Sequence, residues 1–257
     1  MTKASNIPIE NNIQVCPTQE QASITTAHLI ADVIKSKQEL GEFAVLGLAT
    51  GNTPKLVYQE LVQMHKNQGL SFKNVISFNL DEYHGITPAH RLSYHRFMRT
   101  YLFDHVDILP ENIHLPFGTW ELNKIEAHCA AYEAKINDYN GIDIQLLGIG
   151  RNGHIAFNEP GSPFDSVTRL IDLHPFTRND AADEFGGLDK VPTQAITMGI
   201  HTIMNAKRIL LLALGKRKAE IIKKTFESEM TPQIPATFLK ARPDIEYIFD
   251  TEAASLL

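Results

Sequence analysis

Short apolar runs alternate with longer amphipathic segments along most of this chain, and this alternation limits the fold more than any other feature. Several runs, such as VLGLA and ILLLAL, are continuous and show no polar alternation. A strand shows such a run when helices cover both faces of its sheet. Strands that alternate with helices form a parallel sheet with helices on both faces. The sequence therefore predicts an α/β protein with a doubly wound, mostly parallel, Rossmann-like sheet.

The apolar runs define the expected elements. We expect strands over 13–16, 43–49, 75–80, 142–149, 169–173, 208–214 and 245–249, and helices over 18–37, 55–66, 94–105, 121–139 and 216–226. Because no linker rich in proline, glycine or serine divides the chain, residues 1–257 are expected to form a single domain. Ligands of open α/β sheets bind beyond the carboxyl ends of the strands. The residues that follow each strand are therefore the candidates for a functional site.

Charge and cysteine content exclude several classes of protein. The net charge of −6 argues against a general nucleic-acid-binding protein. Cys16 and Cys129 stand far apart without a CxxC spacing, which fits a reducing compartment. The polar start MTKASNIPIENN lacks the apolar core of a secretory signal, and the aliphatic run 209–214 is too short to span a bilayer. We expect a cytoplasmic protein without nucleic-acid or membrane partners.

Two post-strand loops have features of phosphate sites. Thr50, Gly51, Asn52 and Thr53 follow the run VLGLA, and Pro54 then opens a helix. Small residues let a ligand approach the backbone, and the free N–H groups of a helix start bind phosphate. The alternative is a plain turn with a threonine cap.

The second loop is basic. Gly215 follows ILLLAL and precedes Lys216, Arg217 and Lys218. Cations at the start of a helix oppose its dipole, at about 0.3–1 kcal/mol each, and a bound anion would offset that cost. The alternative is three solvated side chains. Together, the small loop and the basic loop favour a phosphate ligand.

Two further stretches carry groups suited to proton transfer. Asp81 and Glu82 follow the run VISFNL, where carboxylates are poor core residues and good catalytic candidates; the alternative is a turn or helix cap. His154 carries an imidazole, a side chain suited to proton transfer, and Glu159 lies five residues further on, across a predicted turn. A histidine oriented by a carboxylate transfers protons. The alternative is a structural histidine beside a surface glutamate.

The stretch 148–153 also has the formal spacing GxGxxG, with Asp172 downstream. This spacing resembles the dinucleotide-binding fingerprint, which requires a helix to open within the glycine run. Here the chain continues through HIAF into the turn signal Asn158-Glu159-Pro160-Gly161. The nicotinamide or flavin interpretation is therefore disfavoured.

With these residues assembled, the chain resembles the glucosamine-6-phosphate deaminase family. The resemblance covers roughly residues 43–220 and rests on the segments LGLATGNTP (46–54), FNLDEYHG (78–85), LLGIGRNGHIAFNEPGS (146–162), FTR (176–178) and LGKRKA (214–219). The family opens the sugar ring, moves the carbonyl from C1 to C2 and releases the amine as ammonia. The resemblance implies a small sugar phosphate as the ligand, no metal or organic cofactor, and a lid-like segment at about 179–194. An ordinary surface loop is the alternative for that segment.

The resemblance also implies residue roles. Asp81 is the base of the enolisation step, and His154 drives ring opening with Asn152 and Glu159 around it. Asn152 stands where the family often has aspartate, so we expect it to hold His154 by a hydrogen bond without adding a charge. The implied phosphate-binding residues are Thr50, Gly51, Asn52, Thr53, Arg178 and Lys218.

A regulatory site is implied only in part. Some family members bind an acetylated amino-sugar phosphate in a second pocket, and Ser162 and Arg169 match two of its residues. Ile171 stands where those members place a lysine. Losing that cation removes a direct partner for phosphate. We therefore expect weak or absent activation by N-acetylglucosamine 6-phosphate.

Three rival functions remain open from the sequence. A 6-phosphogluconolactonase-like hydrolase resembles the family in fold but needs no C2 base. A galactosamine-6-phosphate deaminase differs only in the sugar epimer. The third is a non-catalytic sugar-phosphate sensor on the same fold; such proteins often carry a DNA-binding region, for which the roughly 40 residues before the first phosphate-loop strand are too few. The chain is expected to act as a monomer or a homo-oligomer.

Overall fold

The computed structural model describes residues 12–257. Residues 1–11 lie outside that part, and so does most of the N-terminal segment in which no secretory signal is expected. The strands are β1 (Ile13–Cys16), β2 (Ala44–Leu48), β3 (Val75–Asn79), β4 (Asp81–Tyr83), β5 (Ile113–His114), β6 (Ile144–Leu147), β7 (Arg169–Asp172), β8 (Gln194–Thr197), β9 (Arg208–Ala213) and β10 (Glu246–Asp250). The helices are α1 (Gln19–Glu39), α2 (Lys55–Gln68), α3 (Tyr94–Tyr101), α4 (Leu122–Asp138), α5 (Pro175–Phe185), α6 (Ile200–Met204) and α7 (Ala219–Glu227). Short 3-10 turns include η2 (Phe103–His105), η4 (Leu188–Lys190) and η5 (Lys216–Lys218).

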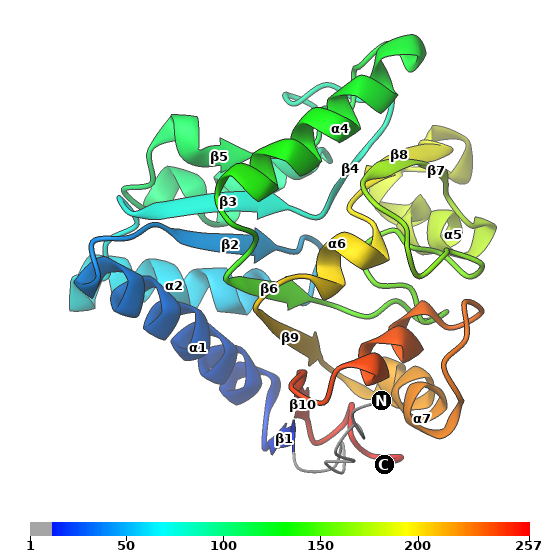
Figure 1. The fold of residues 1–257 in the computed structure, drawn as a ribbon. Helices are drawn as coiled ribbons and strands as arrows, with labels where there is room; N and C mark the ends of the chain where they lie inside the picture. The colour runs from blue at the N-terminus through cyan, green and yellow to red at the C-terminus, as the bar shows by residue number, and fades with distance from the viewer. Residues whose placement is uncertain (1–11) are drawn as a thin grey trace, which may run out of the picture.

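The main sheet has seven strands in the order β1-β10-β9-β6-β2-β3-β5, and every neighbouring pair is parallel. In Figure 1, α4 and α6 lie in front of this sheet and α2 runs behind it. The strands β2, β3 and β6 are buried along their whole length, as expected for a sheet covered on both faces. The predicted doubly wound α/β fold is confirmed.

A second, smaller sheet was not predicted. It has three antiparallel strands in the order β4-β8-β7 and lies beyond the carboxyl ends of the main strands (Figure 1). The strand expected at 169–173 belongs here as β7, and not to the parallel sheet. Strands as short as β4 and β5, with three and two residues, are too short to show a period in the sequence. Their pairing comes from tertiary contacts.

The helix predictions hold except at two ends: the helix expected at 216–226 begins as the 3-10 turn η5 and becomes α7 only at Ala219, and the helix expected at 94–105 ends early. The helix expected at 18–37 is α1, which Thr18 caps by accepting a hydrogen bond from the Gln21 N–H at 3.2 Å. The helix expected at 94–105 ends at Tyr101, and a separate 3-10 turn follows. The segment 179–194, expected as a lid or a surface loop, is helical as far as Phe185 because α5 continues through its first half.

The core lies between the main sheet and its helices, and β9 contributes five fully buried residues to it. Within residues 12–257, no helix combines the length and apolar character needed to cross a membrane. The parallel arrangement has one consequence for function: the loops after β2, β3, β6 and β9 all meet at the same edge of the sheet.

Candidate active site

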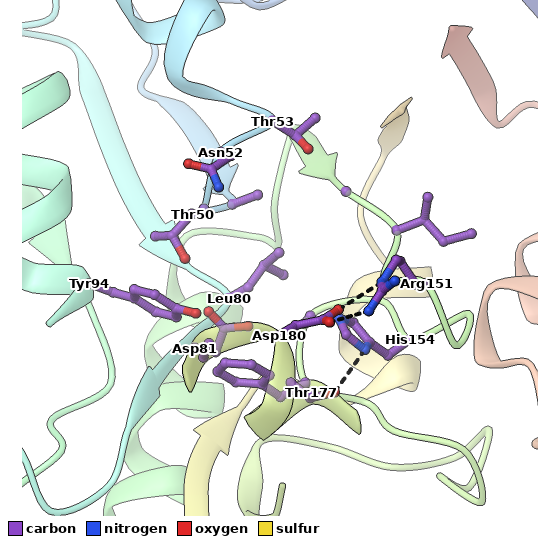
Figure 2. Close-up of a pocket in the computed structure, with 18 of the residues that line it drawn as sticks. Thr50, Asn52, Thr53, Leu80, Asp81, Tyr94, Arg151, His154, Thr177 and Asp180 are labelled. Atoms are coloured by element: carbon purple, nitrogen blue, oxygen red, sulfur yellow. Dashed lines mark hydrogen bonds and ion pairs between the residues drawn. The ribbon is translucent and has the colours of Figure 1, made fainter. Parts of the chain in front are cut away.

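A cavity of about 260 Å³ lies where those loops meet. It is lined by residues that follow β2, β3, β6 and β9, and by one side of α5 (Figure 2). Asp81 and His154, which come from distant parts of the sequence, both line it. The fold thus brings a carboxylate and an imidazole into one shared cleft.

The small loop after β2 forms one wall. Thr50, Gly51, Asn52 and Thr53 all line the cavity. Gly51 has φ +92°, a left-handed conformation that favours glycine. Helix α2 starts beside this loop without any side-chain cap, so the alternative of a threonine-capped turn does not describe it. Its first N–H groups are therefore not already taken by a side-chain cap.

Of the three cations after β9, only Lys218 lines the cavity, whereas Lys216 and Arg217 are exposed. The Lys218 ammonium donates a hydrogen bond to the Ile149 carbonyl at 2.6 Å. Burial lowers the pKa of Lys218, while the nearby Asp180 carboxylate raises it. Lys216 and Arg217 thus match the alternative of solvated surface side chains, whereas Lys218 is the one of the three that can bind an anion in the cavity.

Asp81 is 5% exposed and lines the cavity, and its carboxyl group makes no hydrogen bond to any side chain or backbone group among residues 12–257. Burial, together with the neighbouring Glu82 carboxylate, raises the pKa of Asp81 well above its ordinary value. A carboxyl group of this kind accepts a proton readily, which is the property of a general base that works near neutral pH.

Glu82 has a different role from Asp81, because consecutive strand residues face opposite sides. Its carboxylate accepts hydrogen bonds from the backbone N–H groups of Tyr83 at 2.9 Å and of Tyr94 and His95 at 3.0 Å each. Burial raises the pKa of Glu82 to about 7, although these three hydrogen bonds oppose the shift. Glu82 therefore fits the alternative weighed from the sequence: it caps the start of α3.

His154 is held from two sides. Its Nδ1 lies 3.4 Å from Glu159 Oε2 and 3.4 Å from Thr177 Oγ1. The ring packs over Gly150, where an added Cβ would lie 2.1 Å from the imidazole. The Gly150 N–H also donates to the His154 carbonyl at 2.9 Å. The glycine at position 150 is thus required by the position of the ring.

Asn152 and Glu159 stand behind His154 and do not line the cavity. The Asn152 amide donates to Glu159 Oε2 at 2.9 Å, and its oxygen accepts from the His154 backbone N–H at 3.2 Å. Burial alone would raise the pKa of Glu159, but hydrogen bonding and charge interaction with His154, with smaller contributions from Thr177 and Asn152, lower it to about 2. The hydrogen bond expected from Asn152 therefore reaches the backbone of His154 and the carboxylate, and not the imidazole.

The glycine run 148–153 does not open a helix. Residues 151–161 form turns with a single bridge between Ile155 and Asn158, and Asp172 is exposed on β7. A pyrophosphate would have no helix N-terminus there, so the geometry of a dinucleotide site is missing.

One face of α5 forms the remaining wall of the cavity. The residues at helical spacing on this face are Thr177, Asp180, Ala181 and Glu184. Arg178 falls outside this face and outside the cavity, and its guanidinium donates to the carbonyls of Leu188 at 3.0 Å and Val191 at 3.2 Å. Helix α5 therefore turns Arg178 away from the cavity in this structure, and the phosphate contact expected from it stays a prediction.

Some residues that line the cavity were not predicted from the sequence, notably Arg151, Tyr94 and Asp180. Arg151 lies within the segment 146–162, which was used for the family resemblance. Asp180 could have been found from helical spacing, because it shares one face with Thr177, but no helix was expected there. The two candidate regulatory residues lie elsewhere and contact each other: the Arg169 guanidinium donates to Ser162 Oγ at 3.2 Å and to Asn158 Oδ1 at 3.0 Å. Ile171, beside them on β7, packs in an apolar cluster.

Histidine, cysteine and carboxylate side chains do not form any cluster of three that fits a metal ion in the part of the chain that the structure describes. The cavity instead offers a base, an imidazole, a cation and a loop of small residues. These groups suit the binding of an anion and the transfer of protons on the same molecule.

Comparison with known proteins identifies the family. Residues 17–247 match the family described as glucosamine-6-phosphate isomerases/6-phosphogluconolactonase. Glucosamine-6-phosphate deaminases of Bacillus velezensis and Bacillus pumilus are 45% and 47% identical, over 95% of this chain and 98% and 99% of theirs. A solved structure of a monomeric glucosamine-6-phosphate deaminase has 43% identity and a TM-score of 0.91, and the match covers 96% of this chain and 100% of that chain. A 6-phosphogluconolactonase from Trypanosoma brucei, at 22% identity, TM-score 0.76 and coverage of 96% and 98%, shares the fold. The chain belongs to the glucosamine-6-phosphate isomerase/6-phosphogluconolactonase family.

Proposed function

We propose that this protein is a glucosamine-6-phosphate deaminase, which converts glucosamine 6-phosphate and water into fructose 6-phosphate and ammonia. One observation carries the proposal: Asp81 and His154 line the same cavity as the small loop 50–53 and Lys218. The cavity thus combines a base, a proton-transfer group and an anion site. The deaminase relatives, at 45% and 47% identity over nearly their whole length, support the same activity.

Phosphate binding fixes the sugar. The loop 50–53 and the Lys218 ammonium line the cavity beside the start of α2, and together they supply N–H groups and a positive charge. Anchoring the phosphate there holds C1 and C2 of the sugar in place at the other groups of the cavity. Binding energy from the remote phosphate then serves the chemical step.

Ring opening comes first, because the closed ring has no acidic C–H. His154 takes the proton from the anomeric hydroxyl and returns a proton to the ring oxygen, so that the ring C–O bond breaks and the C1 aldehyde forms. Glu159 and Asn152 hold the imidazole through the contacts behind it. A positioned acid–base group of this kind contributes about 10²–10⁴-fold to the rate.

Isomerisation follows. Asp81 takes the C2 proton, which the neighbouring aldehyde makes acidic, and the aldehyde oxygen takes up a proton, so that an enolamine with a C1 hydroxyl forms. The same carboxyl group returns a proton to C1 and the nitrogen loses one, which gives a ketimine at C2. Water then adds to C2 and ammonia leaves, so that the product carries its carbonyl at C2. The raised pKa of Asp81 suits a group that must both accept and return this proton.

The test is ammonia release from purified protein. Glucosamine 6-phosphate should give ammonia and fructose 6-phosphate in equal amounts. Galactosamine 6-phosphate and 6-phosphogluconolactone should be tested beside it, because they represent the epimer and hydrolase alternatives. Lactone hydrolysis without ammonia release from either amino sugar would contradict the proposal.

The proposed chemistry also indicates the cellular compartment in which the protein works. We infer that the protein works in the cytoplasm, where sugar phosphates are metabolised. Cys16 and Cys129 are both free and buried, which suits a reducing compartment. Cell fractionation with detection of ammonia-releasing activity would test this inference.

A further inference from the structure

An ion pair crosses the cavity wall beside the phosphate-binding groups. Arg151 follows β6 and Asp180 belongs to α5, and both line the cavity. The Arg151 Nε donates to Asp180 Oδ2 at 3.0 Å, and Nη2 donates to the other carboxylate oxygen. Figure 2 shows the two side chains joined by these bonds. The guanidinium also stacks on the Phe176 ring, 4.7 Å from its centre. Contacts with Asp180 and Phe176 of α5 therefore fix the orientation of the Arg151 guanidinium.

The position of Asp180 is unexpected in a phosphate site. Its carboxylate interacts with Lys218 as well as with Arg151, so one anion of the protein sits among the cations of the cavity. A carboxylate there would repel a sugar phosphate. The same carboxylate presents two oxygens to the guanidinium fork, as a phosphate does.

We infer that Asp180 occupies the place of the substrate phosphate before substrate binds, and that binding exchanges this carboxylate for the phosphate on Arg151. The inference rests on the proposed function and adds Arg151 as a phosphate-binding residue and Asp180 as its internal competitor. The exchange is reversible, since the pair is only partly shielded: the side chains are 44% and 42% exposed. Exposed pairs of this kind contribute little and are easily replaced.

The same helix also contacts the imidazole. Thr177 lies one turn before Asp180 on α5, and its hydroxyl is 3.4 Å from His154 Nδ1. The proposed exchange therefore takes place on the helix that also contacts the ring-opening group.

The two members of the pair should respond in opposite directions. Arg151→Gln removes a phosphate partner and should weaken binding about tenfold or more. Asp180→Asn removes the competitor and should tighten binding about threefold at low ionic strength, where exposed charges are least screened. Arg151→Lys keeps the charge but loses the fork, so it should restore binding only in part.

The probe is inorganic phosphate, titrated by calorimetry at low ionic strength, with the KM for glucosamine 6-phosphate measured in parallel. Arg99→Gln is the matched control, because Arg99 of α3 pairs with Asp104 at 3.0 Å, with 58% and 53% exposure, and neither residue lines the cavity. This control should leave both values unchanged.

A purely structural ion pair would give a different result. Both substitutions would then loosen α5 and weaken phosphate binding together, and that outcome would overturn the inference. So would a wild-type protein that binds no phosphate, or an Arg151→Gln variant within twofold of wild type. Phosphate binding with opposite responses, but no ammonia release by wild type, would support the exchange and refute the deaminase activity.

Discussion

Asp81→Asn should strongly lower turnover and stabilise the protein, and the two effects share one cause. Asp81 is buried beside the Glu82 carboxylate, and its carboxyl group makes no hydrogen bond to the described residues. Its pKa is therefore raised, which means that ionising it is less favourable in the folded protein than in the unfolded chain. Asparagine has nearly the same shape and no charge, so it removes this cost together with the base.

The sign of the pH dependence follows from the raised pKa. The stability contributed by protonated Asp81 is fully present below the unfolded pKa of about 4 and is lost as pH rises through the folded value. The advantage of the Asp81→Asn variant should thus be absent in acid and grow toward neutral pH. We expect about 0.5–2 kcal/mol, the range of a single stabilising substitution. For a chain of this length this raises Tm by about 1–8 °C.

The assay is thermal unfolding of both proteins from pH 4 to pH 8, with ammonia release measured on the same samples. Turnover by the variant should fall by about 10²–10⁴-fold. In wild type, kcat/KM should rise with pH through a value above the ordinary range of aspartate. Retained activity would remove Asp81 from the mechanism. A Tm that falls at pH 7, or a gain that is independent of pH, would refute the account of its burial.

Asp143 provides the matched control for this experiment. It is as buried as Asp81, at 6% exposure, but it accepts from the Val45 N–H at 2.9 Å and from the Lys207 ammonium at 2.7 Å. Its carboxylate is therefore satisfied. Asp143→Asn should lower stability by about 1–3 kcal/mol and leave the catalytic rate unaffected.

The other predictions concern the remaining groups of the cavity. His154→Gln should slow the reaction of the closed sugar by about 10²–10⁴-fold and that of an open-chain analogue much less; equal effects in steady-state assays would contradict ring opening by His154. Lys218→Ala should raise KM by about 10–150-fold with a smaller change in kcat, and an unchanged KM would make Lys218 a structural residue. Gly150→Ala places a methyl group 2.1 Å from the His154 ring, so kcat should fall about 10²-fold, whereas normal turnover would show that the ring position is not critical.

The sequence predicted most strands of the main sheet, because a strand buried on both faces appears as a continuous apolar run. The run ILLLAL predicted β9, and VLGLA predicted β2, since no polar residue interrupts either strand. Parallel topology then placed the residues after these strands at one edge. The small loop 50–53 and Lys218 were found in this way, and both line the cavity.

The second sheet and the face of α5 were missed for the opposite reason. β4, β7 and β8 are held by antiparallel pairing between segments far apart in the chain, and β7 is mostly half-exposed. Nothing in a local period records such pairing. Likewise, the hydrophobic pattern of α5 is weak, so no helix was expected there and Asp180 was not recognised.

The amino-acid sequence by itself determined the α/β class, the parallel sheet and the identity of the groups that follow its strands, because these depend on burial patterns and residue chemistry. Only the tertiary structure decided which of two adjacent candidate residues faces the cavity. It turned Asp81 inward and Glu82 toward α3, brought Asn152 and Glu159 behind His154, and turned Arg178 away. The physical reason is that orientation depends on pairing and packing between distant segments, which fix each side chain only once the chain is folded.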